Sequence, residues 1–179
     1  MKVLAIIFEG FEEEEAMAPF ALLRRAGITL DIASSNTTVR GSHNLYLTNL
    51  KLIDEVNYKD YDMLLLPGGA HYKLLVQSKF VLDAITYFME NNKLISAICA
   101  SPTILGKMGY LKNRNYTCFT SMNADFGGTY IDKKVVVDGN LITARSVASA
   151  LVFAYAIIEK LLGKDALNKI KEQIYEKED

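Results

Sequence analysis

Four runs of apolar residues constrain the fold of this chain more than any other feature of its sequence. They lie at 3–7 (VLAII), 28–33 (ITLDIA), 63–67 (MLLLP) and 94–98 (LISAI). Largely apolar runs of this length are typical of strands buried on both faces of a parallel sheet. The chain is therefore expected to build its core around such a sheet.

Helical patterns occupy the segments between these runs. They span roughly Glu14 to Ala26, Phe80 to Asn91 and Ser101 to Met108, and Gly27 and Gly109 close the first and the third. Alternation of strand and helix predicts an α/β fold with a mostly parallel sheet that helices cover on both faces.

The end of the chain follows a different pattern. An Asp-Gly-Asn turn at 138–140 between two apolar runs indicates a β-hairpin. A helix is predicted over Val147 to Leu162, and apolar residues at helical spacing within 164–179 predict an amphipathic surface helix. Because no linker or repeat interrupts the sequence, we expect a single domain over 1–179.

Composition excludes several classes of function. The net charge is −1 and no basic run is interleaved with aromatic residues, which argues against a nucleic-acid binder. Two cysteines without a CxxC motif predict neither a disulfide framework nor a dithiol site. The longest apolar segment, 147–158, falls short of the roughly 20 residues that span a bilayer. Acidic residues directly follow the first apolar run, unlike a signal peptide. We expect a cytoplasmic protein without a membrane span.

Three loops are expected to meet at the carboxyl ends of the predicted strands, where ligand sites of open parallel sheets lie. The first carries Glu9 to Glu15, the second Gly68 and Gly69, and the third Cys99. These segments are far apart in sequence, and together they predict one small cleft.

Cys99 is the candidate nucleophile. It lies between small residues where a strand turns into a helix, which resembles the nucleophile elbow of hydrolases. The free N–H groups at the helix start are expected to lower the pKa of its thiol below about 8.5. The alternative is an inert cysteine that fills a strand end. We interpret Cys118 as a core residue.

Backbone amides are the candidate oxyanion hole. The Pro67-Gly68-Gly69 turn lets the backbone approach a bound oxygen closely, and the N–H groups of Gly69 and Ala100 are suited to stabilise a negative charge there. An ordinary strand-to-helix turn explains the two glycines equally well.

The acidic run Glu12 to Glu15 is most simply a solvated helix N-terminus. One face of that helix must turn toward the sheet, however, so one carboxylate is expected to face the cleft with a raised pKa and to transfer protons. His43 and His71 are each either a general base or an exposed loop residue without a role. Because neither has metal-ligand spacing with a second histidine, no metal site is predicted.

These motifs carry a family resemblance that covers nearly the whole chain. The segments GFEEEEAMAPFALLRRAGI (10–28), YDMLLLPGG (61–69) and ISAICASPTILGKMG (95–109) resemble the ThiJ/PfpI superfamily, in particular the branch of the parkinsonism-associated protein deglycase and its bacterial relatives. The resemblance implies a flavodoxin-like three-layer sandwich and a homodimer. It also implies that an oxidation-prone nucleophile, Cys99, is hydrogen-bonded to a protonated Glu15.

The resemblance further implies an enzyme without a cofactor that acts on small reactive carbonyls or glycated groups, as a glyoxalase or protein deglycase. Cys99 would be the nucleophile, Glu15 the proton shuttle, and Gly69 and Ala100 the oxyanion amides. The alternative from the same family is a redox sensor or stress chaperone in which Cys99 is oxidised to a sulfinate. A third reading is a module that binds a metabolite without chemistry.

The sequence departs from the family pattern at several positions near the cleft. Ala100 replaces the histidine that follows the nucleophile in the protease-like branch, so proteolysis is not expected. Phe119 stands where the deglycase branch has a histidine, and Ser146 and Val147 replace a Gly-Pro pair. His43 lies where that branch often has a basic residue. It is a candidate cleft-lining residue together with Gly68, His71 and Phe119.

Overall fold

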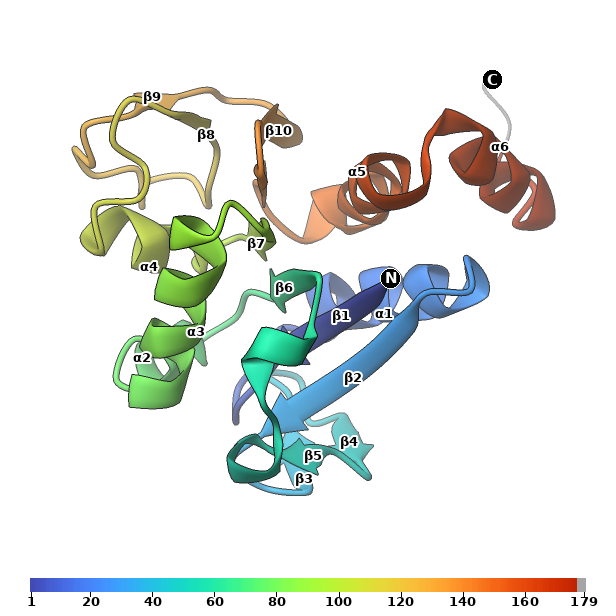
Figure 1. Ribbon diagram of the computed structural model, residues 1–179, viewed down its shortest axis with the longest axis horizontal. Helices are drawn as coiled ribbons and strands as arrows, with labels where there is room; N and C mark the ends of the chain where they lie inside the picture. Colours follow the sequence, from blue (N-terminus) through green and yellow to red (C-terminus); the bar gives the residue numbers. More distant parts are fainter. Residues whose placement is uncertain (177–179) are drawn as a thin grey trace.

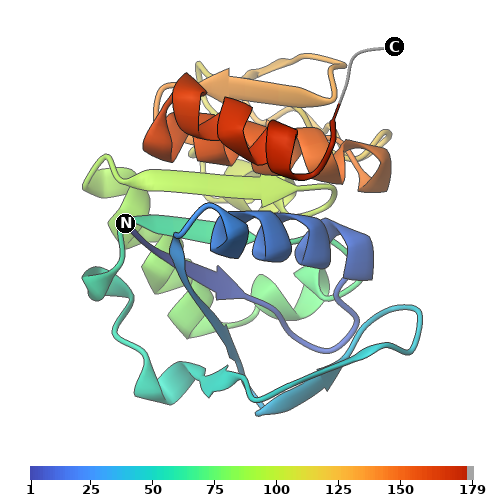
Figure 2. The same ribbon diagram turned by 90° about the vertical axis from the view of Figure 1, so that its right-hand side faces the viewer.

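A computed structural model describes residues 1–176 and places one large sheet between two layers of helices (Figures 1 and 2). The sheet has seven strands in the order β10-β11-β7-β6-β1-β2-β5. Every neighbouring pair is parallel except β10 and β11. The predicted three-layer α/β fold is confirmed. The last three residues of the expected 1–179 domain lie outside the described range.

The strands match the four predicted apolar runs and add several short elements. The main sheet contains β1 (Lys2–Ile6), β2 (Thr29–Ser34), β5 (Lys51–Leu52), β6 (Met63–Leu66), β7 (Leu94–Ile98), β10 (Val135–Asp138) and β11 (Leu141–Ala144). Two separate pairs are formed by β3 (Thr38–Arg40) with β4 (Tyr46–Thr48) and by β8 (Asn115–Tyr116) with β9 (Thr129–Tyr130). The antiparallel pair β10–β11 confirms the predicted hairpin.

The three helices predicted within 14–108 are present with shifts of one residue at their ends, the helix predicted from Val147 begins three residues later, and the short helix at 72–75 was not predicted. The helices are α1 (Glu13–Arg25), α2 (Tyr72–Leu75), α3 (Lys79–Glu90), α4 (Pro102–Lys107), α5 (Ala150–Leu162) and α6 (Lys164–Gln173). Short 3₁₀ turns cover Ile53–Glu55, Tyr58–Asp60 and Val147–Ser149, the last in place of the first turn of the helix predicted from Val147. No helix among residues 1–176 is long and apolar enough to cross a membrane.

The core has two halves because successive strand residues point to opposite faces of the sheet. Val3 and Ala5 of β1 pack on one side in a cluster with residues of α1, α5 and α6. Leu4 and Ile6 pack on the other side with residues of α3 and α4. Figure 1 shows these helix layers on either side of the strands. Burial of both strand faces explains why these runs are continuously apolar.

The amphipathic helix predicted at the end of the chain is present as α6. Its Leu167 and Ile170 are buried in the same cluster as α1 and α5, and its other residues are mostly exposed. The sheet order also decides where the site lies. Strands β7, β6 and β1 are adjacent and parallel, so the loops that follow them meet at one edge.

Candidate functional site

Backbone hydrogen bonds join the loops after β1 and β6. The N–H of Glu12 donates to the carbonyl of Gly68 at 2.8 Å, and Phe11 forms an isolated antiparallel bridge with Gly69. Gly69 has φ +105°, and a Cβ at this position would overlap the backbone nitrogen of Glu12. The two loops therefore approach as closely as they do because position 69 is a glycine.

Cys99 occupies the sharp turn between β7 and α4. Its N–H still donates to the Ala144 carbonyl at 3.0 Å, so the backbone leaves the sheet at this residue. Its φ of +65° is in the left-handed region, which costs a residue other than glycine about 1–3 kcal/mol. The side chain is partly exposed. A strained, partly exposed cysteine at a strand-to-helix turn fits the nucleophile elbow that the sequence predicted.

Gly68 lets Glu15 and Cys99 approach the same point. A Cβ on Gly68 would overlap both the Oε2 atom of Glu15 and the Cβ of Cys99. Glu15 belongs to the first turn of α1, whereas Cys99 follows β7. The loop after β6 therefore lies against both side chains, and it fits there because position 68 has no Cβ.

The Glu15 carboxylate is fully buried and poorly satisfied. Among residues 1–176, neither of its oxygens has a hydrogen-bond partner of good geometry. Burial raises the pKa of Glu15 to about 7. Its interaction with the Cys99 thiol opposes that rise, as do the N–H groups of Gly68 and Val147 more weakly. A buried carboxyl in this state can both accept and donate a proton near neutral pH.

The thiol of Cys99 does not have the lowered pKa that the sequence predicted. Burial and the negative charge of Glu15 raise the pKa of the Cys99 thiol to about 12, against the N–H groups of Gly69 and Ala100. The prediction was wrong because it counted the helix N-terminus alone. The α4 helix has only 6 residues, and the buried carboxylate lies beside the sulfur.

The two groups nevertheless form one coupled acid–base pair. When the shared proton is on Glu15, the carboxylate charge that opposes a Cys99 thiolate disappears. The amides of Gly69 and Ala100 then favour the thiolate. The ionisation of each group therefore depends on that of the other.

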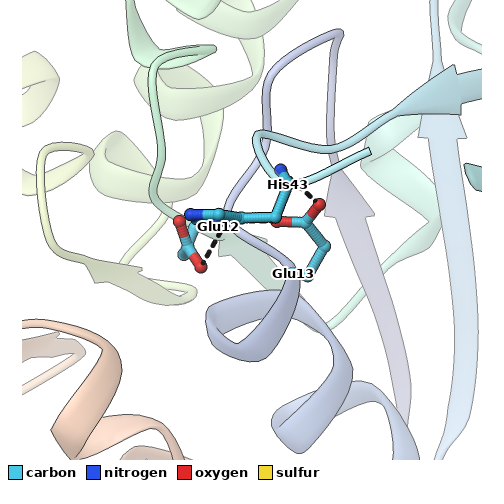
Figure 3. Close-up of side chains that lie close together, drawn as sticks. All are labelled: Glu12, Glu13 and His43. Atoms are coloured by element: carbon cyan, nitrogen blue, oxygen red, sulfur yellow. Dashed lines mark hydrogen bonds and ion pairs between the residues drawn. The ribbon is translucent and has the colours of Figure 1, made fainter. Parts of the chain in front are cut away.

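The rest of the acidic run is not uniformly solvated, in contrast to the simplest expectation. Glu14 is exposed, but Glu13 is buried and held by a neighbouring loop (Figure 3). Its Oε1 accepts the N–H groups of His43 at 2.7 Å and Leu45 at 3.4 Å, and its Oε2 lies 3.1 Å from His43 Nδ1. Glu12 Oε1 lies 3.5 Å from the same nitrogen.

These contacts bring Glu12, Glu13 and His43 into one cluster. One ligand atom of each lies within 4.8 Å of the others, and carboxylate and imidazole are donor types that divalent metals accept. The three side chains satisfy one another, with mutual attraction that raises the pKa of His43. The expectation that the chain has no metal site stays a prediction. His43 itself is largely exposed, and its ring lies against Glu13 and Glu12.

His71 is neither an exposed loop residue nor a cleft base, so both readings from the sequence were wrong. It is completely buried, and burial lowers the pKa of its imidazole to about 4. Its Nδ1 accepts the N–H of Phe8 at 3.0 Å, and its Nε2 lies 2.9 Å from the Pro67 carbonyl. Both ring nitrogens are therefore occupied by the backbone.

The remaining candidates border the site through their backbones. The N–H of Phe119 donates to the Cys99 carbonyl at 2.8 Å, and its side chain is largely exposed. Cys118 is buried, which confirms its assignment to the core. The sequence did not reveal that the N–H of Val147 faces Glu15, because a backbone contact leaves no signal in residue type.

Comparison with known proteins identifies the group to which this architecture belongs. The model of the DJ-1/PfpI family matches residues 1–160. Protein dj-1beta of Drosophila melanogaster is 34% identical over 173 residues, which cover 93% of this chain and 92% of that protein. The solved structure of Drosophila melanogaster DJ-1beta aligns with a TM-score of 0.90 at 33% identity and covers 97% of both chains.

Among the other relatives, one is named for an activity and one is much longer than this chain. Deglycase PH1704 of Pyrococcus horikoshii is 32% identical over 166 residues, which cover 90% of this chain and 99% of that protein. Protein DJ-1 homolog B of Arabidopsis thaliana is 34% identical over 169 residues, or 92% of this chain. The chain spans only 39% of the length of that plant protein.

Proposed function

This chain belongs to the DJ-1/PfpI family, and from that premise we propose that it is an enzyme acting on small reactive carbonyls, as a glyoxalase or protein deglycase. One observation carries the proposal. The buried Glu15 carboxylate, which lacks a hydrogen-bond partner of good geometry among residues 1–176, lies beside the strained, partly exposed Cys99. A relative named as a deglycase supports the carbonyl chemistry.

The first chemical step is addition of the cysteine to an aldehyde. The Cys99 sulfur forms a bond to the carbonyl carbon while its proton passes to the Glu15 carboxylate. The electron pair of the C=O bond moves to oxygen, where the N–H groups of Gly69 and Ala100 are suited to stabilise the alkoxide. Glu15 then returns the proton to that oxygen, which gives a neutral hemithioacetal on Cys99.

The raised pKa of Glu15 suits this exchange. With a pKa of about 7, a large fraction of the Glu15 carboxyl is ionised at neutral pH and can accept the thiol proton. The protonated carboxyl is also acidic enough to give that proton back. An ordinary surface glutamate would be a much weaker base toward a thiol whose pKa burial has raised. Glyoxalase and deglycase reactions share this addition, so the site alone does not select between them.

The second candidate function is a redox sensor or stress chaperone. Cys99 is partly exposed and accessible to peroxide, whereas Cys118 is buried. A protonated Glu15 is suited to donate a hydrogen bond to a sulfinate on Cys99. A homodimer, a cytoplasmic location and activity without a cofactor are further expectations that accompany both functions.

The test compares Cys99→Ser with Cys118→Ser as the matched control. Methylglyoxal loss is followed on each variant, and intact mass is measured on the same samples after graded peroxide treatment. The enzyme proposal expects turnover in wild type and Cys118→Ser, none in Cys99→Ser, and a gain of two oxygens only where Cys99 is present. Selective oxidation of Cys99 without any turnover would contradict the enzyme proposal and support the redox sensor.

A further inference from the structure

His71 is a buried ionisable side chain that the proposed reaction does not use. It lies two residues after Gly69 and directly before α2, with no exposed surface. A buried imidazole needs hydrogen-bond partners for both ring nitrogens. Without them, the folded protein is less stable than it would be with an apolar residue of similar size at that position. Its partners therefore indicate why a histidine occupies this position.

The two contacts of the ring require one tautomer. Nδ1 accepts the N–H of Phe8 at 3.0 Å, so it carries no proton. Nε2 therefore carries the proton and donates to the Pro67 carbonyl at 2.9 Å. The neutral ring is thus an acceptor on one side and a donor on the other, a combination that few other side chains offer.

This bridge joins the ends of two neighbouring strands. The last paired residues of β1 and β6 in the sheet are Ala5 and Leu65, and the two strands are not paired with each other beyond them. Phe8 lies at the start of the loop between β1 and α1, the helix that contains Glu15. The imidazole connects the strands after their own hydrogen bonds have ended.

The third loop is tied to the same carbonyl. The hydroxyl of Ser101, two residues after Cys99, donates to the Pro67 carbonyl at 2.5 Å. The N–H of His71 also donates to the Gly10 carbonyl at 3.1 Å. One carbonyl oxygen, directly before Gly68, is thus held both by the histidine and by the nucleophile turn.

We propose that His71 is a positioning residue whose imidazole, together with Ser101, sets the distance between Glu15, Gly69 and Cys99. The kinetic part of this inference rests on the proposed function, whereas the effect on thiol reactivity does not. An apolar residue of the same size would fill the space. It would also leave the Phe8 N–H and the Pro67 carbonyl without the ring, and the loops would then depend on the backbone bonds farther along, from Glu12 to Gly68 and from His71 to Gly10.

Two near-isosteric variants separate the two bonds. His71→Gln places an amide N–H near the Nε2 position and is expected to keep the bond to Pro67. His71→Asn places an amide oxygen near Nδ1 and is expected to keep only the bond to Phe8. His71→Leu removes both. If the bond to Pro67 positions the site, Gln retains function and Asn does not.

Two readouts are measured on each folded variant. The first is the rate of Cys99 alkylation by iodoacetamide as a function of pH, and the second is kcat and KM for methylglyoxal. We expect His71→Asn and His71→Leu to lower kcat by about 10²-fold with little change in KM, since small displacements of reacting groups have this effect. Both should also shift the pH midpoint of alkylation, whereas His71→Gln should stay within about fivefold of wild type.

The matched control is Asn140→Ala at the opposite end of β7. Asn140 also makes a side-chain bond to the backbone, partly buried, from Nδ2 to the Lys93 carbonyl at 2.9 Å. Its loss should lower the unfolding midpoint but leave the alkylation profile unchanged. A folded His71→Leu variant with the wild-type alkylation profile would overturn the inference.

Two further outcomes keep the test decisive. If His71→Leu does not fold, Ser101→Ala removes the other bond to Pro67 and must itself shift the alkylation profile, or the inference fails. If wild-type protein does not consume methylglyoxal, the proposed function fails, but the alkylation profiles still decide the role of His71.

Discussion

Glu13 and Glu15 lie two residues apart at the start of α1, and both are buried, yet their environments are opposite. Glu13 accepts two backbone N–H groups and contacts His43, and these contacts overcome burial and lower its pKa. Glu15 has no comparable partner among residues 1–176, and burial raises its pKa to about 7. Burial alone therefore does not decide the behaviour of a carboxylate; the donors that surround it do.

The comparison assigns different work to the two residues. Glu13 fixes the loop of residues 41–45 against α1, because its carboxylate is hydrogen-bonded to that loop at several points. Glu15 has no comparable contacts among residues 1–176, and its charged carboxylate would be more stable in water than in this buried position. A group that is unfavourable for stability and lies next to a strained cysteine is typical of a reactive site.

The largest expected effect is on turnover. Glu15→Gln removes the proton acceptor, and kcat/KM for methylglyoxal should fall by about 10²-fold or more. Glu13→Gln, the matched control on the same helix, should change it by less than about fivefold, because the Glu13 carboxylate is bonded to His43 and Leu45. Equal losses in the two variants would erase the distinction between the residues.

Glycine substitutions test the same distinction from the surrounding backbone. A Cβ on Gly68 would overlap Glu15 and Cys99, whereas a Cβ on Gly41 would overlap the Glu13 side chain. Gly68→Ala should therefore lower kcat/KM by about 10-fold to 10²-fold. Gly41→Ala should chiefly lower stability. The prediction fails if Gly41→Ala impairs turnover more than Gly68→Ala, with both rates corrected for the folded fraction.

Stability should move in opposite directions for the two glutamates. The pKa of Glu15 is raised from 4.5 to about 7, so its contribution to stability is highest at acidic pH and is lost as the pH rises toward 7. At about pH 8, Glu15→Gln should stabilise the fold by up to about 3 kcal/mol. Glu13→Gln should cost about 1–2 kcal/mol because charge-assisted bonds are lost.

Urea unfolding at about pH 8 measures both changes on the same scale. A destabilised Glu15→Gln variant would mean that the Glu15 carboxylate has hydrogen-bond partners in solution that offset the cost of its burial.

The smallest effect is expected at His43. Its ring is largely exposed, and its neighbour Glu13 keeps the backbone bonds when the ring is removed. The pKa of His43 is raised above 6.5, so its stabilising contribution is complete below that pH and is lost as the pH rises through the raised value. His43→Asn should give a slightly lower melting temperature at acidic pH and no change at alkaline pH. A larger loss at alkaline pH would contradict this.

The sequence predicted the sheet and its helices because both-face burial leaves a strong signal. The runs at 3–7, 63–67 and 94–98 became β1, β6 and β7 almost without change. The β3–β4 hairpin was not predicted, because the segment 35–49 is rich in Ser, Asn and Thr and its longest apolar stretch has only three residues, at 45–47. Its strands are short and mostly exposed, so little hydrophobic patterning is required of them.

The site was predicted in part for a related reason. The loops of Glu15, Gly68 and Cys99 were expected to meet because the carboxyl ends of parallel strands share one edge of a sheet, and the strand order of the structure places them there. The pKa of Cys99 and the burial of His71 depend on contacts between residues distant in the chain. Nor did four successive glutamates reveal which of them the 41–45 loop would hold.

The most direct test of the shared proton between Glu15 and Cys99 is the pH dependence of kcat/KM for methylglyoxal, which reports the ionisation of the free enzyme. Since the reactive form must have lost the first proton of the pair, kcat/KM should rise about tenfold per pH unit up to the Glu15 pKa of about 7 and then level off. In Glu15→Gln the limb near pH 7 should disappear, and the low remaining rate should rise only at the higher pH where the Cys99 thiol itself ionises. An unchanged limb near pH 7 in Glu15→Gln would contradict the account.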